Sequence, residues 1–140
     1  MKHRMASALL SLCGALLAAY LYLYKTGRIG TLACGTGSCE MVQFSPYAQV
    51  LGVEVSLIGL LGYLVLLICS IAALQAAPDQ RPASVRALFI LSGLGVAFSA
   101  YLTAIELFVL HAICRWCVGS AVIITLIFIT ALLDRRRTAR

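Results

Sequence analysis

The sequence predicts an all-α membrane protein, a bundle of four transmembrane helices, and three observations support this. Of the 140 residues, 62% are hydrophobic and 11% are charged, whereas a soluble domain carries about 25% charged residues. The mean hydropathy is +1.00. Four apolar runs are each long enough to cross ~30 Å of hydrocarbon as a helix. These observations exclude an ordinary soluble domain, and the richness in Leu, Ile and Val excludes a disordered chain.

The predicted spans form one integral membrane domain, 1–140, and cover about residues 5–24, 55–77, 87–112 and 114–133. Isolated glycines within them, such as Gly59 and Gly95, are tolerated in membrane helices. The third span holds one acidic residue, Glu106, which either serves the bundle interior or reaches water at the helix end. A polar loop, 25–54, joins the first two spans, and a turn at Pro78–Arg86 joins the next two.

The charge distribution predicts the orientation of the bundle. The net charge is +6, but the basic residues bracket the apolar runs, which argues against nucleic-acid binding and for the positive-inside rule. We expect both termini in the cytoplasm, with the loop 25–54 and the last turn facing the periplasm or exterior of a bacterial inner or plasma membrane. Eight basic residues then lie inside and three outside: Lys2, Arg4, Arg81, Arg86, Arg135, Arg136, Arg137 and Arg140 against Lys25, Arg28 and Arg115.

The two ends of the sequence carry further information about membrane placement. The arginines of 135–137 are suited to contact anionic membrane lipid. A cleaved signal peptide is the rival interpretation of the N-terminus. The apolar run of about 20 residues is longer than a usual signal core and favours a retained span.

The six cysteines fall into three groups. Cys13 and Cys69 lie within spans and are expected to be small packing residues. Cys34 and Cys39 lie in the loop, and Cys114 and Cys117 lie at the outer tip of the fourth span. These four therefore share one side of the membrane.

The pair Cys114-Arg-Trp-Cys117 carries the strongest chemical signal. Residues three apart share a helix face, so the two sulfurs can reach disulfide geometry. The free N–H groups of a first helical turn favour a thiolate, which is the attacking species in thiol–disulfide exchange. An inert structural disulfide is one alternative. A zinc ion held by the four outer thiolates is another, although we expect no metal here.

The loop pair suggests a relay. The connecting residues Gly-Thr-Gly-Ser are small and flexible, which suits a pair that exchanges between partners. A soluble dithiol would pass electrons to Cys34 and Cys39, and these would pass them on to the membrane pair. No haem or iron–sulfur ligation pattern is present in the sequence. A lipid-soluble quinone is the acceptor that the membrane location favours.

Two stretches of the sequence resemble the vitamin K epoxide reductase family. The first is Ser38-Cys-Glu-Met-Val-Gln-Phe-Ser-Pro-Tyr-Ala48, followed by Gly52 and Ser56-Leu-Ile-Gly-Leu-Leu-Gly-Tyr63. The second is Ser99-Ala-Tyr-Leu102, Glu106 and Ile113-Cys-Arg-Trp-Cys117 with Ser120. The resemblance covers about residues 8–133. The combination of a loop pair with a late CxxC is far more specific than a CxxC alone.

The resemblance implies a four-helix bundle around a quinone, either ubiquinone or menaquinone. It implies that Cys117 faces the quinone, that Cys114 exchanges with Cys39, and that Cys34 meets an external thioredoxin-like (DsbA-type) protein. The segment after Cys39 would form a short half-helix that caps the pocket. Many bacterial relatives carry a fused thioredoxin-like domain. This sequence shows none, so we expect a separate periplasmic partner.

Several side chains are candidates for the quinone pocket, although core packing predicts many of the same residue types. Ser45 occupies a family position near the relay, and Trp116 and Tyr47 suit an interfacial belt or the pocket mouth. His111 is a candidate proton donor or simply an interfacial residue. The full candidate set is Phe44, Ser45, Tyr47, Leu57, Tyr63, Tyr101 and Trp116.

Departures from the family pattern narrow the expected chemistry. Ala121 stands where animal members have a Tyr, and Val55 replaces the quinone-side Asn of the family. Both favour simple quinone reduction over epoxide reduction. The predicted function is a membrane thiol–quinone oxidoreductase that reoxidises a disulfide-forming protein. Two rival classes are a small carrier of soft metal ions and a structural subunit with two static disulfides.

Overall fold

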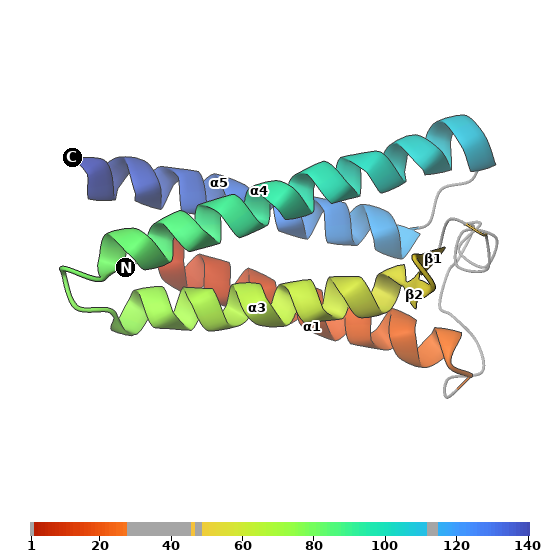
Figure 1. Ribbon diagram of the computed structural model, residues 1–140, viewed down its shortest axis with the longest axis horizontal. Helices are drawn as coiled ribbons and strands as arrows, with labels where there is room; N and C mark the ends of the chain where they lie inside the picture. Colours follow the sequence, from red (N-terminus) through yellow and green to blue (C-terminus); the bar gives the residue numbers. More distant parts are fainter. Residues whose placement is uncertain (1, 28–45, 47–48, 112–114) are drawn as a thin grey trace.

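Four long helices run side by side along one axis in the computed structural model, which describes residues 2–27, 46, 49–111 and 115–140 (Figure 1). They are α1 (Lys2–Lys25), α3 (Val55–Gln75), α4 (Arg81–Ile105) and α5 (Arg115–Ala139). A π-helical segment, η2 (Glu106–Leu110), continues α4. Each of these helices, α4 taken with η2, is long and apolar enough to cross a membrane. The predicted fold class, an all-α membrane bundle, is confirmed.

Three helices, α1, α4 and α5, extend beyond the predicted spans at the end that carries the termini, whereas α3 ends at Gln75, two residues before the predicted end. Helix α4 begins at Arg81, about one and a half turns before the span predicted from residue 87, and α5 runs on to Ala139. Pro82 stands in the first turn of α4, where a missing N–H costs nothing and the fixed φ suits a helix. The apolar run therefore marks only the part of each helix that can lie in the hydrocarbon of a bilayer. The basic residues beyond that run continue the same helix.

A small hairpin lies within the predicted loop 25–54. Strands β1 (Gln49–Val50) and β2 (Val53–Glu54) pair antiparallel, and α3 starts directly after β2. The turn residues Leu51 and Gly52 have φ of 54° and 80°, as a type I′ turn requires. Leu51 therefore adopts a left-handed conformation that costs an L-residue roughly 1–2 kcal/mol. The half-helix predicted after Cys39 falls outside the described residues.

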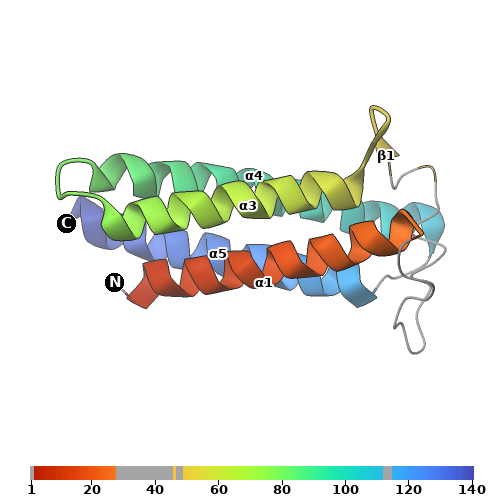
Figure 2. The ribbon, with the colours of Figure 1, turned by 90° about the horizontal axis from the view of Figure 1, so that it is seen from below.

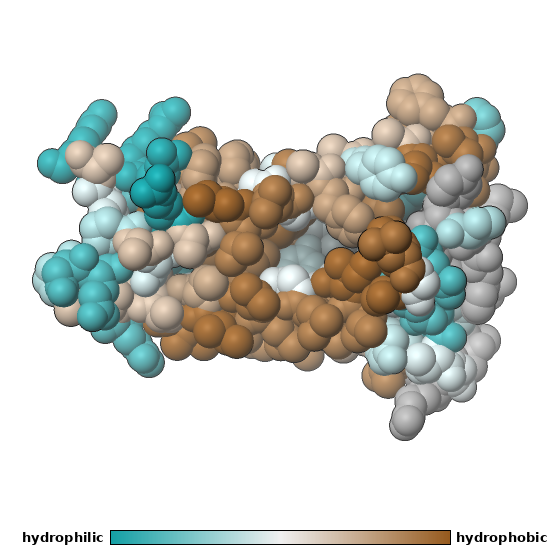
Figure 3. Space-filling view, viewed as in Figure 1, coloured by the Kyte–Doolittle hydropathy of each residue, from teal (hydrophilic) through white to brown (hydrophobic). Residues whose placement is uncertain are grey.

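Small side chains let the helices pack closely. The buried face of α1 carries Ser7, Ser11, Gly14, Ala15 and Ala18 at helical spacing, and close approach through small residues is how membrane helices associate. The bundle also has apolar side chains on its outside. Leu9, Ile68 and Phe108 are 62%, 65% and 76% exposed. A broad hydrophobic band covers the middle of the bundle on the face drawn in Figure 3. Such a band suits contact with lipid.

The two ends of the bundle differ. Both termini lie at one end (Figure 1), where Arg4 on α1 meets Asp134 on α5. The Nε–Oδ2 distance is 2.7 Å and the Nη2–Oδ1 distance is 3.2 Å. Arg4 Nη1 also donates to the Ala73 carbonyl of α3 at 3.5 Å. The two charged side chains are 9% and 7% exposed, so this is a buried ion pair that joins three helices.

Candidate functional site

A cavity of about 460 Å³ lies in the half of the bundle away from the termini. All four helices contribute to its wall, α1 through Leu17, Ala18 and Leu21. A hollow is visible between α3 and α4 in the apolar band (Figure 3). The volume falls in the range of small-molecule sites, which is roughly 300–1,000 Å³. An apolar molecule with a ring-sized head group therefore fits this space.

The wall is mostly hydrocarbon with a few polar groups. Apolar cavities with a small number of placed polar groups are typical of ligand sites, because those groups fix the orientation of what binds. The polar side chains come from α3, α4, η2 and α5, and they are the hydroxyls of Ser56, Tyr63, Ser99, Thr103 and Ser120, the carboxyl of Glu106 and the thiol of Cys117.

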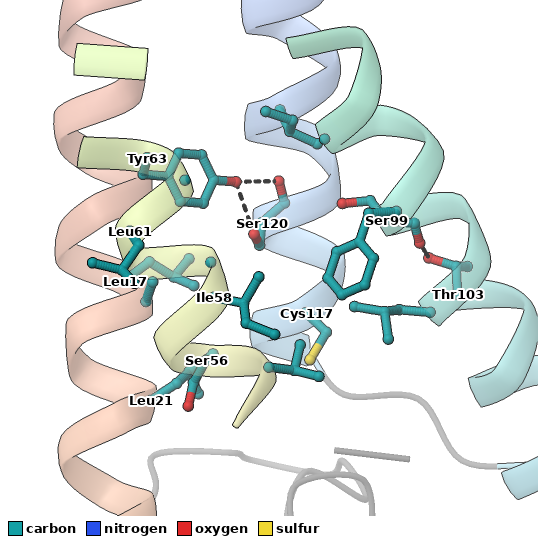
Figure 4. Close-up of a pocket in the computed structure, with 18 of the residues that line it drawn as sticks. Leu17, Leu21, Ser56, Ile58, Leu61, Tyr63, Ser99, Thr103, Cys117 and Ser120 are labelled. Atoms are coloured by element: carbon teal, nitrogen blue, oxygen red, sulfur yellow. Dashed lines mark hydrogen bonds between the residues drawn. The ribbon is translucent and has the colours of Figure 1, made fainter. Parts of the chain in front are cut away.

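Cys117 places sulfur on this wall. It is the third residue of α5, and its sulfur lies between α3 and α4 in the close-up (Figure 4). The side chain is half-buried. Its position in the first helical turn agrees with the prediction that the CxxC opens the fourth helix. The sulfur therefore faces a space that a small apolar molecule can enter.

Tyr63 of α3 links two parts of the cavity wall through its hydrogen bonds to Ser120 of α5. Its hydroxyl donates to the Ser120 carbonyl oxygen at 2.9 Å and lies 2.8 Å from the Ser120 Oγ (Figure 4). Ser120 follows Cys117 by three residues, so these bonds hold the helical turn that carries the thiol. Gly14 on α1 makes the arrangement possible, because a Cβ built there would overlap the Tyr63 ring.

Ser56 contributes a buried polar group to the cavity wall. It is 8% exposed, and its Oγ is buried without a hydrogen bond in the described part of the chain. It also lies in the first turn of α3, where backbone N–H groups lack helical acceptors. A buried hydroxyl without a partner is costly. A carbonyl oxygen that entered the cavity here would find donors, so this part of the wall fits a quinone.

The structure gives the positions of Glu106 and His111, two titratable residues to which the sequence assigns two alternative roles each. Glu106 is 5% exposed and lines the cavity at the start of η2, so its side chain belongs to the interior and does not reach into water. His111 is exposed and ends η2 with a left-handed φ of 51°. It is not part of the cavity wall.

The predicted pocket residues divide into three groups. Tyr63 and Cys117 line the cavity. Trp116, Leu57 and Tyr101 are placed but do not line it. Trp116 packs instead on Tyr20 of α1, with ring centroids 5.1 Å apart. The third group lies outside the described residues and consists of Cys34, Cys39, Cys114, Phe44, Ser45 and Tyr47.

The hydroxyls of Ser56, Ser99, Thr103 and Ser120 and the carboxyl of Glu106 are the polar wall groups that our site prediction omitted. A signal for them exists in the sequence. Ser99 and Thr103 are four residues apart, and Ser56 precedes Tyr63 by seven. Residues at these spacings share one helix face. Polar residues on one face of an apolar span point to a bundle interior or a cavity.

Comparison with known families gives one further finding. The model of the vitamin K epoxide reductase family matches residues 5–132 of this chain. The match extends over all four membrane helices and therefore covers the whole cavity wall. It also agrees with the resemblance carried by the two sequence stretches around Cys39 and Cys117.

Proposed function

The chain belongs to the vitamin K epoxide reductase family, and on this premise we propose that it oxidises the dithiol of a separate thioredoxin-like protein and reduces a quinone. Membership indicates an oxidoreductase of the thiol–quinone type in an integral membrane bundle. The finer proposal is that the reaction supports disulfide formation outside the cytoplasm. One observation carries it: the Cys117 thiol lies on the wall of an apolar cavity inside a membrane bundle.

The proposed electron path has three steps, two thiol–disulfide exchanges and one reduction of a quinone. The partner's dithiol reduces the Cys34–Cys39 disulfide, and the partner is released as a disulfide. Cys39 then attacks Cys114 of the Cys114–Cys117 disulfide, and closure of Cys34–Cys39 leaves the membrane pair as two thiols. A bound quinone accepts two electrons and two protons, which these thiols give up as their disulfide re-forms. Electrons and protons balance, and each cysteine pair returns to its starting state.

The residues of the wall have separate tasks in this proposal. The hydroxyl of Ser56 and the first-turn N–H groups of α3 hold a carbonyl oxygen. The Tyr63–Ser120 bonds fix the turn that presents Cys117. The apolar walls from α1 and α4 exclude water from the thiol, which protects the reduced pair from side reactions.

The decisive experiment measures quinone reduction by the purified protein in detergent. The donor is a reduced thioredoxin-like dithiol, and ubiquinone and menaquinone analogues are assayed in parallel. Cys117→Ala should abolish turnover because no membrane pair can then form. Cys69→Ala is the matched control. Cys69 lies in α3 but not on the cavity wall, so this variant should turn over at the wild-type rate.

Other outcomes would identify a rival class. A folded protein that reduces neither quinone but carries stoichiometric metal would support the metal carrier and overturn the proposal. Equal loss of turnover in all six single-cysteine variants would also overturn it, because Cys13 and Cys69 have no place in the path. Cys34→Ser should instead trap the Cys39–Cys114 mixed disulfide, because the thiol that resolves it is missing, and a non-reducing gel resolves this species.

The proposed orientation places both termini in the cytoplasm and the cavity end outside. It follows from the eight-to-three distribution of basic residues listed above. A protease-sensitive tag on the C-terminus tests it. Inverted membrane vesicles should expose the tag to protease, whereas intact spheroplasts should protect it. The reverse pattern would contradict the orientation without affecting the chemistry.

A further inference from the structure

The β1–β2 hairpin has an unusual distribution of polar and apolar residues. Its base is polar, because Gln49 pairs with Glu54, whereas the next pair is Val50 with Val53. The turn itself carries Leu51, which is 98% exposed, and Val53 is 42% exposed. A hairpin that projects into water normally has polar residues at its turn. This one becomes more apolar toward its tip.

The backbone adds an independent observation. Leu51 has a φ of 54°, a conformation that Gly, Asn and Asp adopt readily and that a branched apolar residue avoids. Asn-Gly is the favoured pair for a two-residue turn of this type, and Gly52 already supplies the second position. The Leu51 side chain is almost fully exposed, so contacts within the protein do not offset the strain. Its stabilising contacts must then lie outside the protein.

The position of the hairpin identifies that environment. Strand β2 runs directly into Val55, the first residue of the apolar helix α3. The hairpin stands off sideways from the helices on the side of α3 (Figure 2). The Tyr20–Trp116 pair lies at the same end of the bundle, and such aromatic residues mark the membrane–water interface. Lipid surrounds a membrane bundle at this level and in this direction.

We propose that the β1–β2 hairpin is a lipid anchor, with Leu51 and Val53 inserted into the interfacial region of the bilayer beside α3. Burial of apolar side chains at the boundary between head groups and acyl chains is the force that holds interfacial segments. The anchor fixes the end of the loop 25–54 to the membrane surface next to the first turn of α3. This inference depends on the membrane bundle and not on the proposed reaction.

Tryptophan fluorescence in lipid nanodiscs tests the anchor directly. Trp116→Phe removes the one native tryptophan, and Leu51→Trp then places a single reporter at the tip. Brominated phosphatidylcholine should remove at least about half of its emission, and acrylamide should quench it weakly. Asp79→Trp in the exposed α3–α4 turn is the matched control. Its tryptophan should respond to acrylamide and not to the brominated lipid.

The opposite pattern at position 51 would overturn the proposal. If the reporter of Leu51→Trp were as open to acrylamide as that of Asp79→Trp, and untouched by brominated lipid, the tip would project into water. The same hairpin would then be a candidate contact for a protein partner. Circular dichroism of each variant shows that it has folded before the quenching is compared.

A second pair of variants distinguishes the effect of the apolar Leu51 side chain from that of the turn conformation. Leu51→Asn creates an Asn-Gly turn that suits the backbone better and removes the apolar tip. The substitution Val53→Trp, again with Trp116→Phe, provides a reporter that measures the depth of the hairpin. Quenching of this reporter by brominated lipid should fall when Leu51→Asn is added. Unchanged quenching would show that Leu51 does not hold the hairpin in lipid.

Discussion

The half of the bundle near the termini is closed, whereas the half near Cys117 is hollow. In the closed half, the Arg4–Asp134 pair joins α1 to α5, and Ser7 Oγ meets Thr130 Oγ1 at 2.7 Å. Ala73 and Ile127 are completely buried there. In the hollow half, the same helices enclose about 460 Å³ of space. The difference suggests a division of tasks, in which polar clamps at one end hold the helices so that the other end can stay open.

Tyr63 marks the boundary between the two halves. It belongs to the central core cluster with Ala15, Ala18 and Leu66, and it also lines the cavity. Its ring fills the space beside Gly14, and its hydroxyl reaches Ser120. A single side chain therefore closes the core below the cavity and supports the turn of Cys117 above it. Four sets of variants test this division between a closed half and a hollow half.

The largest effect on stability is expected at the ion pair. Asp134→Ala leaves the Arg4 guanidinium buried without its carboxylate, which typically costs about 3–5 kcal/mol. Thermal unfolding in detergent, followed by circular dichroism, measures it. The double variant Arg4→Leu with Asp134→Leu should recover most of the loss, because removal of both charges leaves none unpaired.

The matched control for this prediction is Arg136→Ala, in the exposed last turn of the same helix. It should change stability by no more than about 0.5 kcal/mol. If Asp134→Ala and Arg136→Ala lowered stability equally, general loss of charge would explain the effect, and the clamp would have no special role.

The next effect is expected where the core meets the cavity. Gly14→Ala pushes a methyl group into the Tyr63 ring, and overpacking of this kind costs about 1–3 kcal/mol. We expect lower thermal stability together with slower quinone reduction, because the displaced ring loses Ser120. Gly62→Ala is the control for stability, since a Cβ at Gly62 meets nothing within 4 Å. A Gly14→Ala protein as stable as Gly62→Ala and as active as the wild type would show that the ring moves freely.

A smaller effect is expected from the hydroxyl alone. Tyr63→Phe keeps the ring and removes the bonds to Ser120, at a cost of about 1 kcal/mol. The turn that carries Cys117 then loses a support, so the rate of quinone reduction should fall more than the stability does. Tyr101→Phe serves for comparison, because Tyr101 is 56% exposed on α4 and should leave both quantities unchanged. Equal behaviour of the two variants would remove Tyr63 from the site.

The smallest effect is expected at Cys13, which is exposed on α1. Cys13→Ala should change the unfolding free energy by less than about 0.5 kcal/mol and leave turnover at the wild-type level. Parallel unfolding and turnover assays measure both quantities. A large loss of turnover would place a thiol of the closed half in the electron path and would remove the distinction between the halves.

The sequence predicted the helices well because each apolar run encodes its own span. The position of Cys117 in the first turn of α5 agrees with the sequence, since a CxxC at a helix start is a local pattern. The sequence did not predict the Arg4–Asp134 pair, whose members are separated by 130 positions and meet only once the bundle has formed. Arg4 fits the pattern of basic residues that set the orientation of the bundle, and Asp134 has no local signal in the sequence.

The choice of pocket residues shows a second limit. A family motif identifies a stretch of helix but not which side of it faces the cavity. Successive residues on a helix differ by about 100°, so Tyr101 lies roughly opposite the face that Ser99 and Thr103 present. Leu57 is likewise turned away from the direction of Ser56. Aromatic or apolar character drew attention to Tyr101 and Leu57, whereas helical spacing of the hydroxyls was the better guide.

The even number of long helices in the described chain has a consequence for any domain joined to a terminus. Because the described chain crosses the bundle four times, both termini lie at the end opposite Cys117 (Figure 1). Cys117 is the third of the 25 residues of α5, so the rest of this helix separates the C-terminal end from the thiol by about 33 Å. A donor domain joined to either terminus would therefore stand on the wrong face of the membrane. Only a linker that crosses the bilayer once more would bring it to the cysteines. An odd number of crossings is thus the architectural condition for building donor and bundle into one polypeptide.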